Sequence, residues 1–170
     1  MSSLKQTRRT ALAAMLLAVM MMLGYVETLF PVAGLPGIKI GLSNSVLMLS
    51  LWWLGVPTSF LLMLGKVLLS GVTFGSLQSM QYALAGGLLS LIVMLIARRT
   101  LRGATPIGIG VLGAVFHNVG QMAVAMLQLR TAALVYYLAI LMLVGVATGC
   151  VTGFIASGLI RRLPKRLLLT

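Results

Sequence analysis

The sequence predicts an all-α protein: a polytopic membrane helix bundle of about six transmembrane helices, with both termini on the cytoplasmic side. Hydrophobic residues make up 60% of the 170-residue chain and charged residues only 8%, against roughly 25% charged residues in soluble domains. Thirteen Lys and Arg residues stand against one acid, Glu27. The cations lie at the ends of long apolar runs, because charge is costly inside hydrocarbon.

The first apolar run, residues 10–26, predicts a membrane-spanning helix. A connection rich in helix breakers follows over residues 27–41, and it contains Pro31, Gly34, Pro36 and Gly37. The next apolar run, residues 40–69, is interrupted at Gly55 and Pro57. We expect two short helices that turn there, and a re-entrant hairpin is the alternative. The part before Gly55 is barely long enough to cross at about 1.5 Å per residue.

Three further spans are expected near residues 80–97, 107–128 and 132–160. Lys and Arg prefer cytoplasmic loops, so the basic residues before the first span, after residue 97 and after residue 160 define the inner side. The run 40–69 must therefore cross an even number of times. We expect one integral membrane domain, residues 1–170, with short basic cytoplasmic tails at 1–9 and 161–170.

The composition also excludes several classes of function. A single acid cannot form a carboxylate pair for acid–base catalysis or a cluster that holds a catalytic metal. Cys150 is the only cysteine, so it cannot form an intrachain disulfide. We expect no enzyme activity, no cofactor and no metal. Nucleic-acid binding is not expected either, because the cations flank apolar runs and are not spread over a polar surface.

Polar side chains inside the apolar runs are the candidate ligand-binding residues. His117 and Gln121 are four residues apart and share a helix face, with Asn118 beside them. Asn44 and Lys66 lie in the preceding runs. Such residues either hydrogen-bond across helices and hold the bundle together, or they form a ligand or proton site.

The predicted topology places Glu27, Lys39 and Arg130 toward the outer side. Together with Lys66, the two outer cations favour an anionic or phosphorylated ligand. Outer aromatic residues form an interfacial belt or, alternatively, line a ligand pocket; the ones considered for the pocket include Phe74 and Tyr82.

Small residues repeat every four positions in two of the predicted spans. Gly145, Gly149 and Gly153 form a row that predicts close helix packing inside the bundle. Ala14 and Ala18 form a shorter row in the first span. This second row favours either internal packing or docking on another membrane protein.

Three segments, ETLFPVAGLPGIKIGLSN, GVTFGSLQSMQYALAGGLLS and GAVFHNVGQ, occur in this order over about residues 27–128. In this they resemble the small bacterial membrane proteins known as Gx transporters or heptaprenyl diphosphate synthase component I. Prenyl diphosphate synthases bind Mg²⁺–diphosphate through Asp-rich motifs, whereas this chain contains no Asp. A role in that synthesis is therefore limited to an accessory, non-catalytic membrane subunit.

The size and the six-span layout also resemble the substrate-binding S components of energy-coupling-factor (ECF) transporters. This resemblance implies a bacterial inner-membrane protein that captures a small vitamin-like, flavin-like or isoprenoid diphosphate-like molecule under the 27–41 connection. It implies that Ala14 and Ala18 dock on a membrane coupling subunit that works with separate ATPases. The accessory subunit of isoprenoid or quinone metabolism stays open as the alternative.

Overall fold

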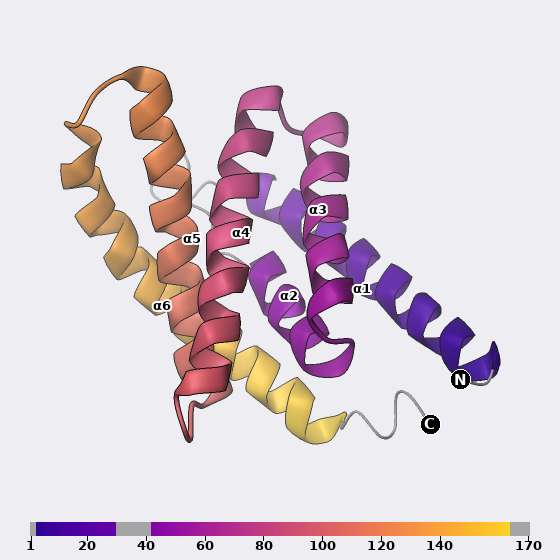
Figure 1. Cartoon of the computed structure of the whole chain (residues 1–170). Helices are drawn as coiled ribbons and strands as arrows, with labels where there is room; N and C mark the ends of the chain where they lie inside the picture. The colour runs from indigo at the N-terminus through magenta and orange to yellow at the C-terminus, as the bar shows by residue number, and fades with distance from the viewer. Residues whose placement is uncertain (1–2, 30–41, 164–170) are drawn as a thin grey trace.

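The structure is a computed structural model that describes residues 3–29 and 42–163. These residues form six helices and contain no strand, which confirms the predicted all-α class for this part of the chain. The helices alternate in direction, so that α1 begins and α6 ends at the same end of the bundle (Figure 1). The α2–α3 and α4–α5 turns lie at this end as well, and the α3–α4 and α5–α6 turns lie at the other (Figure 1).

The first helix, α1 (Ser3–Leu29), is longer than predicted at both ends. It includes residues 3–9, which we expected to be a basic tail, because Lys and Arg favour helix and can continue one beyond an apolar run. It also includes Glu27, which we assigned to the connection. That assignment is wrong: Glu27 is buried in the last turn of α1, because no Pro or Gly occurs between Gly24 and Pro31 to end the helix earlier. The remainder of the connection, residues 30–41, lies outside the described residues.

The apolar run 40–69 folds as two helices, α2 (Leu42–Trp53) and α3 (Val56–Thr73), which confirms the predicted break. Gly55 has a φ of 86° at the turn, a conformation that glycine adopts without strain. Pro57 lies in the first turn of α3, where its missing N–H is not needed. Ser50 Oγ and Ser59 Oγ share a hydrogen bond of 2.8 Å across the turn.

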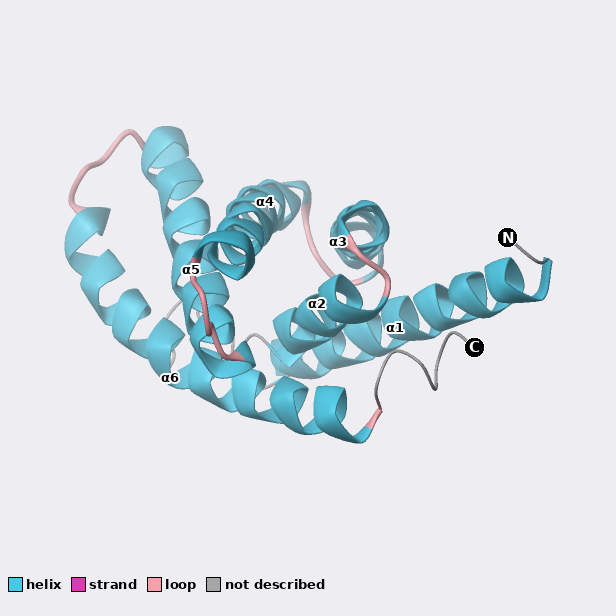
Figure 2. Cartoon of the chain, turned by 60° about the horizontal axis from the view of Figure 1, so that its bottom comes forward, coloured by secondary structure: helices cyan, strands magenta, loops and turns pink. Residues whose placement is uncertain are grey.

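The short helix α2 lies at the centre of the bundle, with α1 and α3 on one side and α5 and α6 on the other (Figure 2). Its 12 residues extend only about 18 Å, whereas the hydrocarbon core of a bilayer is about 30 Å thick. The other helices give five candidate spans in the described part of the chain. The chain is thus a multi-pass membrane protein. The second of the six predicted spans corresponds to α2, a buried helix that is too short to cross the membrane by itself.

The second half of the chain forms α4 (Leu77–Thr100), α5 (Pro106–Leu129) and α6 (Leu134–Arg162). Local capping explains where α4 and α5 begin. Ser76 and Ser79 form a reciprocal capping box at the start of α4. Thr105 caps α5 by accepting from the Gly108 N–H, and Pro106 occupies its first position.

Glycines bring α5 and α6 into backbone contact. A Cβ atom added at Gly149 would lie 2.5 Å from the Cα of Val111, and one at Gly153 would lie 2.7 Å from the Cα of Ile107. Only glycine permits such an approach, which confirms the internal packing predicted for this row. Ala14 and Ala18, in contrast, are exposed on the outer face of α1.

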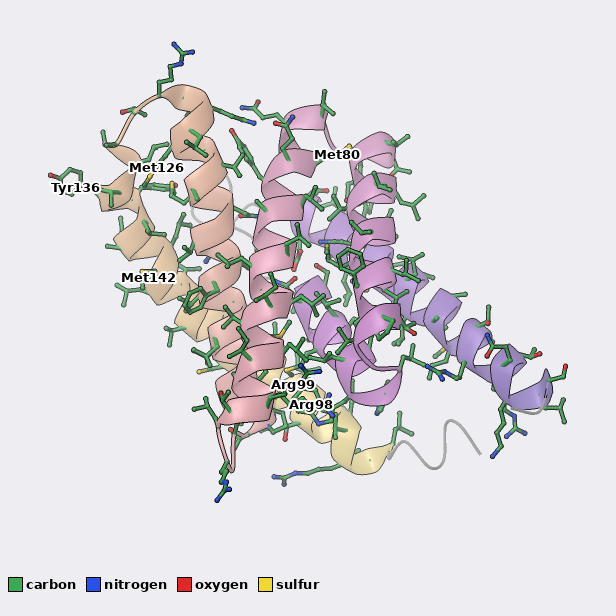
Figure 3. The ribbon with its side chains drawn as sticks, in the orientation of Figure 1. Met80, Arg98, Arg99, Met126, Tyr136 and Met142 are labelled. Carbon is green, nitrogen blue, oxygen red and sulfur yellow. The ribbon has the colours of Figure 1, made fainter. Side chains whose placement is uncertain are left out.

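Charged side chains hold both ends of α2. At its N-terminus the Leu42 N–H donates to the Glu27 carboxylate. At its C-terminus Arg98 donates to the Leu51 carbonyl at 2.8 Å and Arg9 donates to the Leu54 carbonyl at 3.1 Å. Arg98 lies at the lower end of the bundle, together with Arg99 (Figure 3). Negative charge at a helix N-terminus and positive charge at a C-terminus both complement the helix dipole.

Candidate functional site

Polar side chains from five helices line one cavity between the two halves of the bundle. Six of the predicted site residues line it, together with three residues that were not predicted, two of them polar. The predicted residues are Glu27 of α1, Asn44 of α2, Lys66 of α3, and His117, Asn118 and Gln121 of α5. The others are Ser43, Ala114 and Thr148. The fold thus brings together six residues from segments that lie far apart in the sequence.

The face of α5 contributes the three residues of the HNVGQ segment. Gln121 and His117 lie one turn apart, and their Nε2 atoms are 2.9 Å from each other. The two side chains thus form one hydrogen-bonded pair on this face of α5. Asn118 Nδ2 donates to the Leu141 carbonyl of α6 at 2.8 Å. Asn118 thus ties two helices together, while the pair His117 and Gln121 presents polar atoms to the cavity.

Gly86 of α4 makes room for the His117 ring. A Cβ atom at this position would lie 2.7 Å from the His117 carbonyl oxygen and 2.8 Å from His117 Nδ1. Likewise, a Cβ atom added at Gly120 of α5 would lie 2.7 Å from the Ala85 carbonyl oxygen of α4. The α4–α5 contact therefore sets the position of the imidazole through backbone atoms.

The N-terminus of α2 opens onto the same cavity. Ser43 and Asn44 line it, and the Leu42 N–H beside them bonds to the Glu27 carboxylate. The first N–H groups of a helix have no partner within the helix and carry partial positive charge. This end of the cavity therefore favours negatively charged or hydrogen-bond-accepting groups.

Lys66 reaches the cavity from α3 by passing beside Gly24 of α1. A Cβ atom at Gly24 would lie 3.7 Å from Lys66 Cε and 3.9 Å from Phe74 Cζ. The small residue thus leaves space for the long apolar stem of the lysine. Lys66 and Glu27 bring one formal charge of each sign to the cavity lining.

The cavity is small. It comprises about 360 Å³ of space between atoms, its open mouth included, but the centre of a water molecule can explore only about 20 Å³ of it. That is room for a water molecule or for one small polar group. A larger ligand could place only its polar end here unless the helices separate.

Four of the predicted ligand-binding residues are not among the described residues that line this cavity. Phe74 packs edge-on against Tyr25, with ring centroids 5.6 Å apart, and Tyr82 accepts a 2.8 Å hydrogen bond from Gln78. Arg130 is exposed beyond α5, where its φ of 49° ends that helix. Lys39 lies outside the described residues.

Two polar residues of the cavity gave only weak signals in the sequence. Ser43 precedes Asn44 at the start of α2, and Thr148 directly precedes Gly149 of the small-residue row in α6. The Thr148 hydroxyl donates to the Gly145 carbonyl at 3.3 Å. A hydroxyl satisfied by its own helix is compatible with burial in an apolar run, so it does not stand out there. In residues 3–29 and 42–163 no three His, Cys, Asp or Glu side chains lie close enough to hold a metal ion.

A family model described as heptaprenyl diphosphate synthase component I matches residues 16–159. The matched segment runs from α1 into the last turn of α6 and includes every residue of the cavity lining. No curated protein and no solved structure matches the chain. Because the match extends over most of the sequence, the chain belongs to the heptaprenyl diphosphate synthase component I family.

Proposed function

We propose that the protein is a non-catalytic, substrate-binding membrane protein of bacterial inner membranes that resembles the S component of an ECF transporter. The observation that carries this proposal is the convergence of Lys66, His117 and Gln121 beside the N-terminus of α2. A cation and two hydrogen-bonding side chains together suit the negatively charged end of a small molecule, while the Glu27 carboxylate caps the N-terminus of α2 beside them.

The size of the cavity limits how such a ligand binds. Only one small polar group fits, so a carboxylate or phosphate enters while the remainder of a vitamin-like, flavin-like or isoprenoid-like molecule extends toward the 30–41 segment. Asn44 and Gln121 supply directional hydrogen bonds, and Lys66 supplies the opposite charge. Lys39 is proposed to approach the ligand from that segment.

Transport requires a partner in this proposal. Ala14 and Ala18 are exposed on α1, and small exposed residues let a second membrane helix approach closely. We propose that a membrane coupling subunit with separate ATPases docks there and that the bundle then reorients to release the ligand to the cytoplasm. The bundle termini and the Arg98 turn lie on the cytoplasmic side in this arrangement.

Native mass spectrometry of the full chain in mild detergent tests the binding proposal. We expect a copurified small anionic molecule in the wild type and its loss in Lys66→Met and Gln121→Leu. Arg130→Gln, which removes an exposed cation outside the cavity, is the matched control and should retain the ligand. Equal occupancy in all four proteins would contradict a ligand site in this cavity.

The family description favours a second candidate, an accessory membrane subunit of heptaprenyl diphosphate synthase. The double variant Ala14→Leu/Ala18→Leu separates the two functions. Under the transport proposal it should lose association with an ATPase module and keep its ligand. If instead the wild type copurifies with a soluble prenyl diphosphate synthase subunit and carries no ligand, the accessory role is correct.

A further inference from the structure

A second, smaller chamber lies beside the ligand cavity. Asn44 and Ala114 border both spaces, so the two adjoin. Side chains and backbone of α2, α4, α5 and α6 enclose the chamber. Its polar side chains are Asn44, Ser45, Ser90 and Thr152. None of them was predicted to act together with the others.

The hydroxyl groups in this chamber present oxygen atoms as acceptors. Ser45 Oγ donates its proton to the Leu42 carbonyl, and Thr152 Oγ1 donates to the Gly149 carbonyl at 3.3 Å. With these protons committed to their own helices, the remaining lone pairs are available to another group. The side-chain carbonyl of Asn44 adds a further oxygen.

Ser90 has no such internal bond. It is completely buried, at 0% exposure, and its Oγ has no hydrogen-bond partner among the described residues. Leaving a buried hydroxyl unsatisfied costs about 1–3 kcal/mol. Gly113 of α5 packs close to it: a Cβ atom there would lie 3.2 Å from Ser90 Oγ and 2.8 Å from Met94 Sδ. Ser90 therefore indicates an occupant that binds to its oxygen.

We propose that this chamber binds a sodium ion. The centre of a water molecule can explore about 10 Å³ of it, which is room for one particle of that size, and a bare sodium ion is no larger than a water molecule. Hard cations take oxygen ligands, which Asn44, Ser45, Ser90 and Thr152 provide. The described residues lining the chamber include no carboxylate, so the site suits a monovalent ion better than a divalent one.

A cation here would also strengthen the binding of an anionic ligand in the adjoining ligand cavity. Opposite charges in adjacent, weakly screened spaces attract, so sodium and an anionic ligand should each raise the affinity of the other by the same factor. This coupling rests on the proposed function, whereas sodium binding itself does not.

The test uses the full chain in lipid nanodiscs without added ligand. Thermal unfolding is followed by tryptophan fluorescence in sodium, potassium and choline chloride at equal ionic strength. We expect a saturable rise of the unfolding midpoint in sodium alone, and a loss of at least tenfold in apparent sodium affinity in Ser90→Ala and Thr152→Val. Ser157→Ala, a buried α6 residue outside the chamber lining, should keep the wild-type affinity.

Equal midpoints in the three salts would overturn the proposal and assign the chamber to water. If the hydroxyl variants fail to fold, Gly113→Ala narrows the chamber without removing an oxygen, because its methyl group would lie 2.8 Å from Met94 Sδ and 3.2 Å from Ser90 Oγ. It should abolish the sodium shift, and an unchanged shift would overturn the site. A sodium shift without any copurified ligand would support the ion site and reject the proposed transport function. The two proposals can therefore fail separately.

Discussion

The two halves of the bundle are held together in different ways. In α4–α6 the contacts are between backbones: Cβ atoms at Gly86, Gly120 and Gly149 would all lie within 3.0 Å of backbone atoms on a neighbouring helix. In α1–α3 the glycines meet side chains instead: Gly71 faces the flexible Met80 side chain of α4, with Met80 Cγ 1.9 Å from where its Cβ would lie, and the other two meet side chains at ordinary distances. A Cβ atom at Gly24 would lie 3.7 Å from Lys66, and one at Gly65 would lie 3.6 Å from Leu17. Large apolar side chains fill the core between these three helices.

This difference indicates a scaffold and a more adaptable part. Backbone contacts cannot slide without collision, whereas leucine and methionine side chains can repack. The ligand cavity takes His117, Asn118 and Gln121 from the glycine-packed half, and it takes Asn44 and Lys66 from the other half. We therefore expect the cavity to enlarge by movement of α1–α3 against a fixed α5.

The largest effect is expected from Gly149→Ala, which attacks the scaffold directly. Its Cβ would lie 2.5 Å from the Val111 Cα, so two backbones must separate. Overpacking of this kind costs about 3 kcal/mol. The thermal unfolding midpoint in detergent measures it. Gly158→Ala on the same helix is the control, because a Cβ atom there would meet only open space. An equal loss of stability in both variants would contradict the conclusion that backbone contacts make α4–α6 the rigid part of the bundle.

Gly86→Ala should combine a stability loss with a binding loss. The added methyl group would collide with the His117 carbonyl oxygen and ring, so α4 must move and the imidazole is displaced. We expect about 2 kcal/mol of destabilisation, together with loss of any copurified ligand. Gly65→Ala in α3 meets only Leu17 side-chain atoms at 3.6 Å and should leave both properties near wild type. Retained binding in Gly86→Ala would show that His117 is not part of the site.

Arg98→Gln tests how the central helix α2 is held at its C-terminus. The substitution removes the 2.8 Å bond to the Leu51 carbonyl and the stacking of the guanidinium 4.4 Å above the Trp52 ring. Because the arginine is exposed to water, we expect a loss of about 1 kcal/mol. The neighbouring variant Arg99→Gln should have no measurable effect on the unfolding midpoint. An equal drop in the unfolding midpoint of Arg99→Gln would show that the positive charge at this end of the bundle, and not the specific Arg98 contacts, stabilises the protein.

The smallest effect is expected from Phe74→Leu, which removes the edge-on contact with Tyr25. Such pairs contribute about 0.5–1.5 kcal/mol beyond their buried area, and the partial exposure of this pair favours the lower value. Tyr136→Leu is the comparison, because Tyr136 is 82% exposed and points away from the bundle (Figure 3). If Phe74→Leu also abolished ligand binding, Phe74 would contact the ligand in the open form of the cavity.

The site was only partly predictable for a physical reason. Polar residues inside apolar runs must be buried against something, so His117, Gln121 and Lys66 could be selected from the sequence. Tyr82 was selected as an aromatic residue and Arg130 as a cation near the outer side, and a residue's depth in the membrane does not say which way its helix faces. Glu27 was selected as a ligand-binding residue, and the structure shows that its carboxylate also caps α2. That bond depends on where a segment distant in sequence begins its helix.

The sequence by itself determined the class of protein and most helix breaks, because hydropathy, charge and Gly or Pro act within a few residues of where they stand. Gly55 and Pro57 end one helix and begin the next whatever surrounds them. The tertiary structure alone decided that α2 is a buried central helix and that Ser45, Ser90 and Thr152 line one chamber. Those relations depend on the rotation and crossing of helices, which many weak contacts over the whole bundle set together.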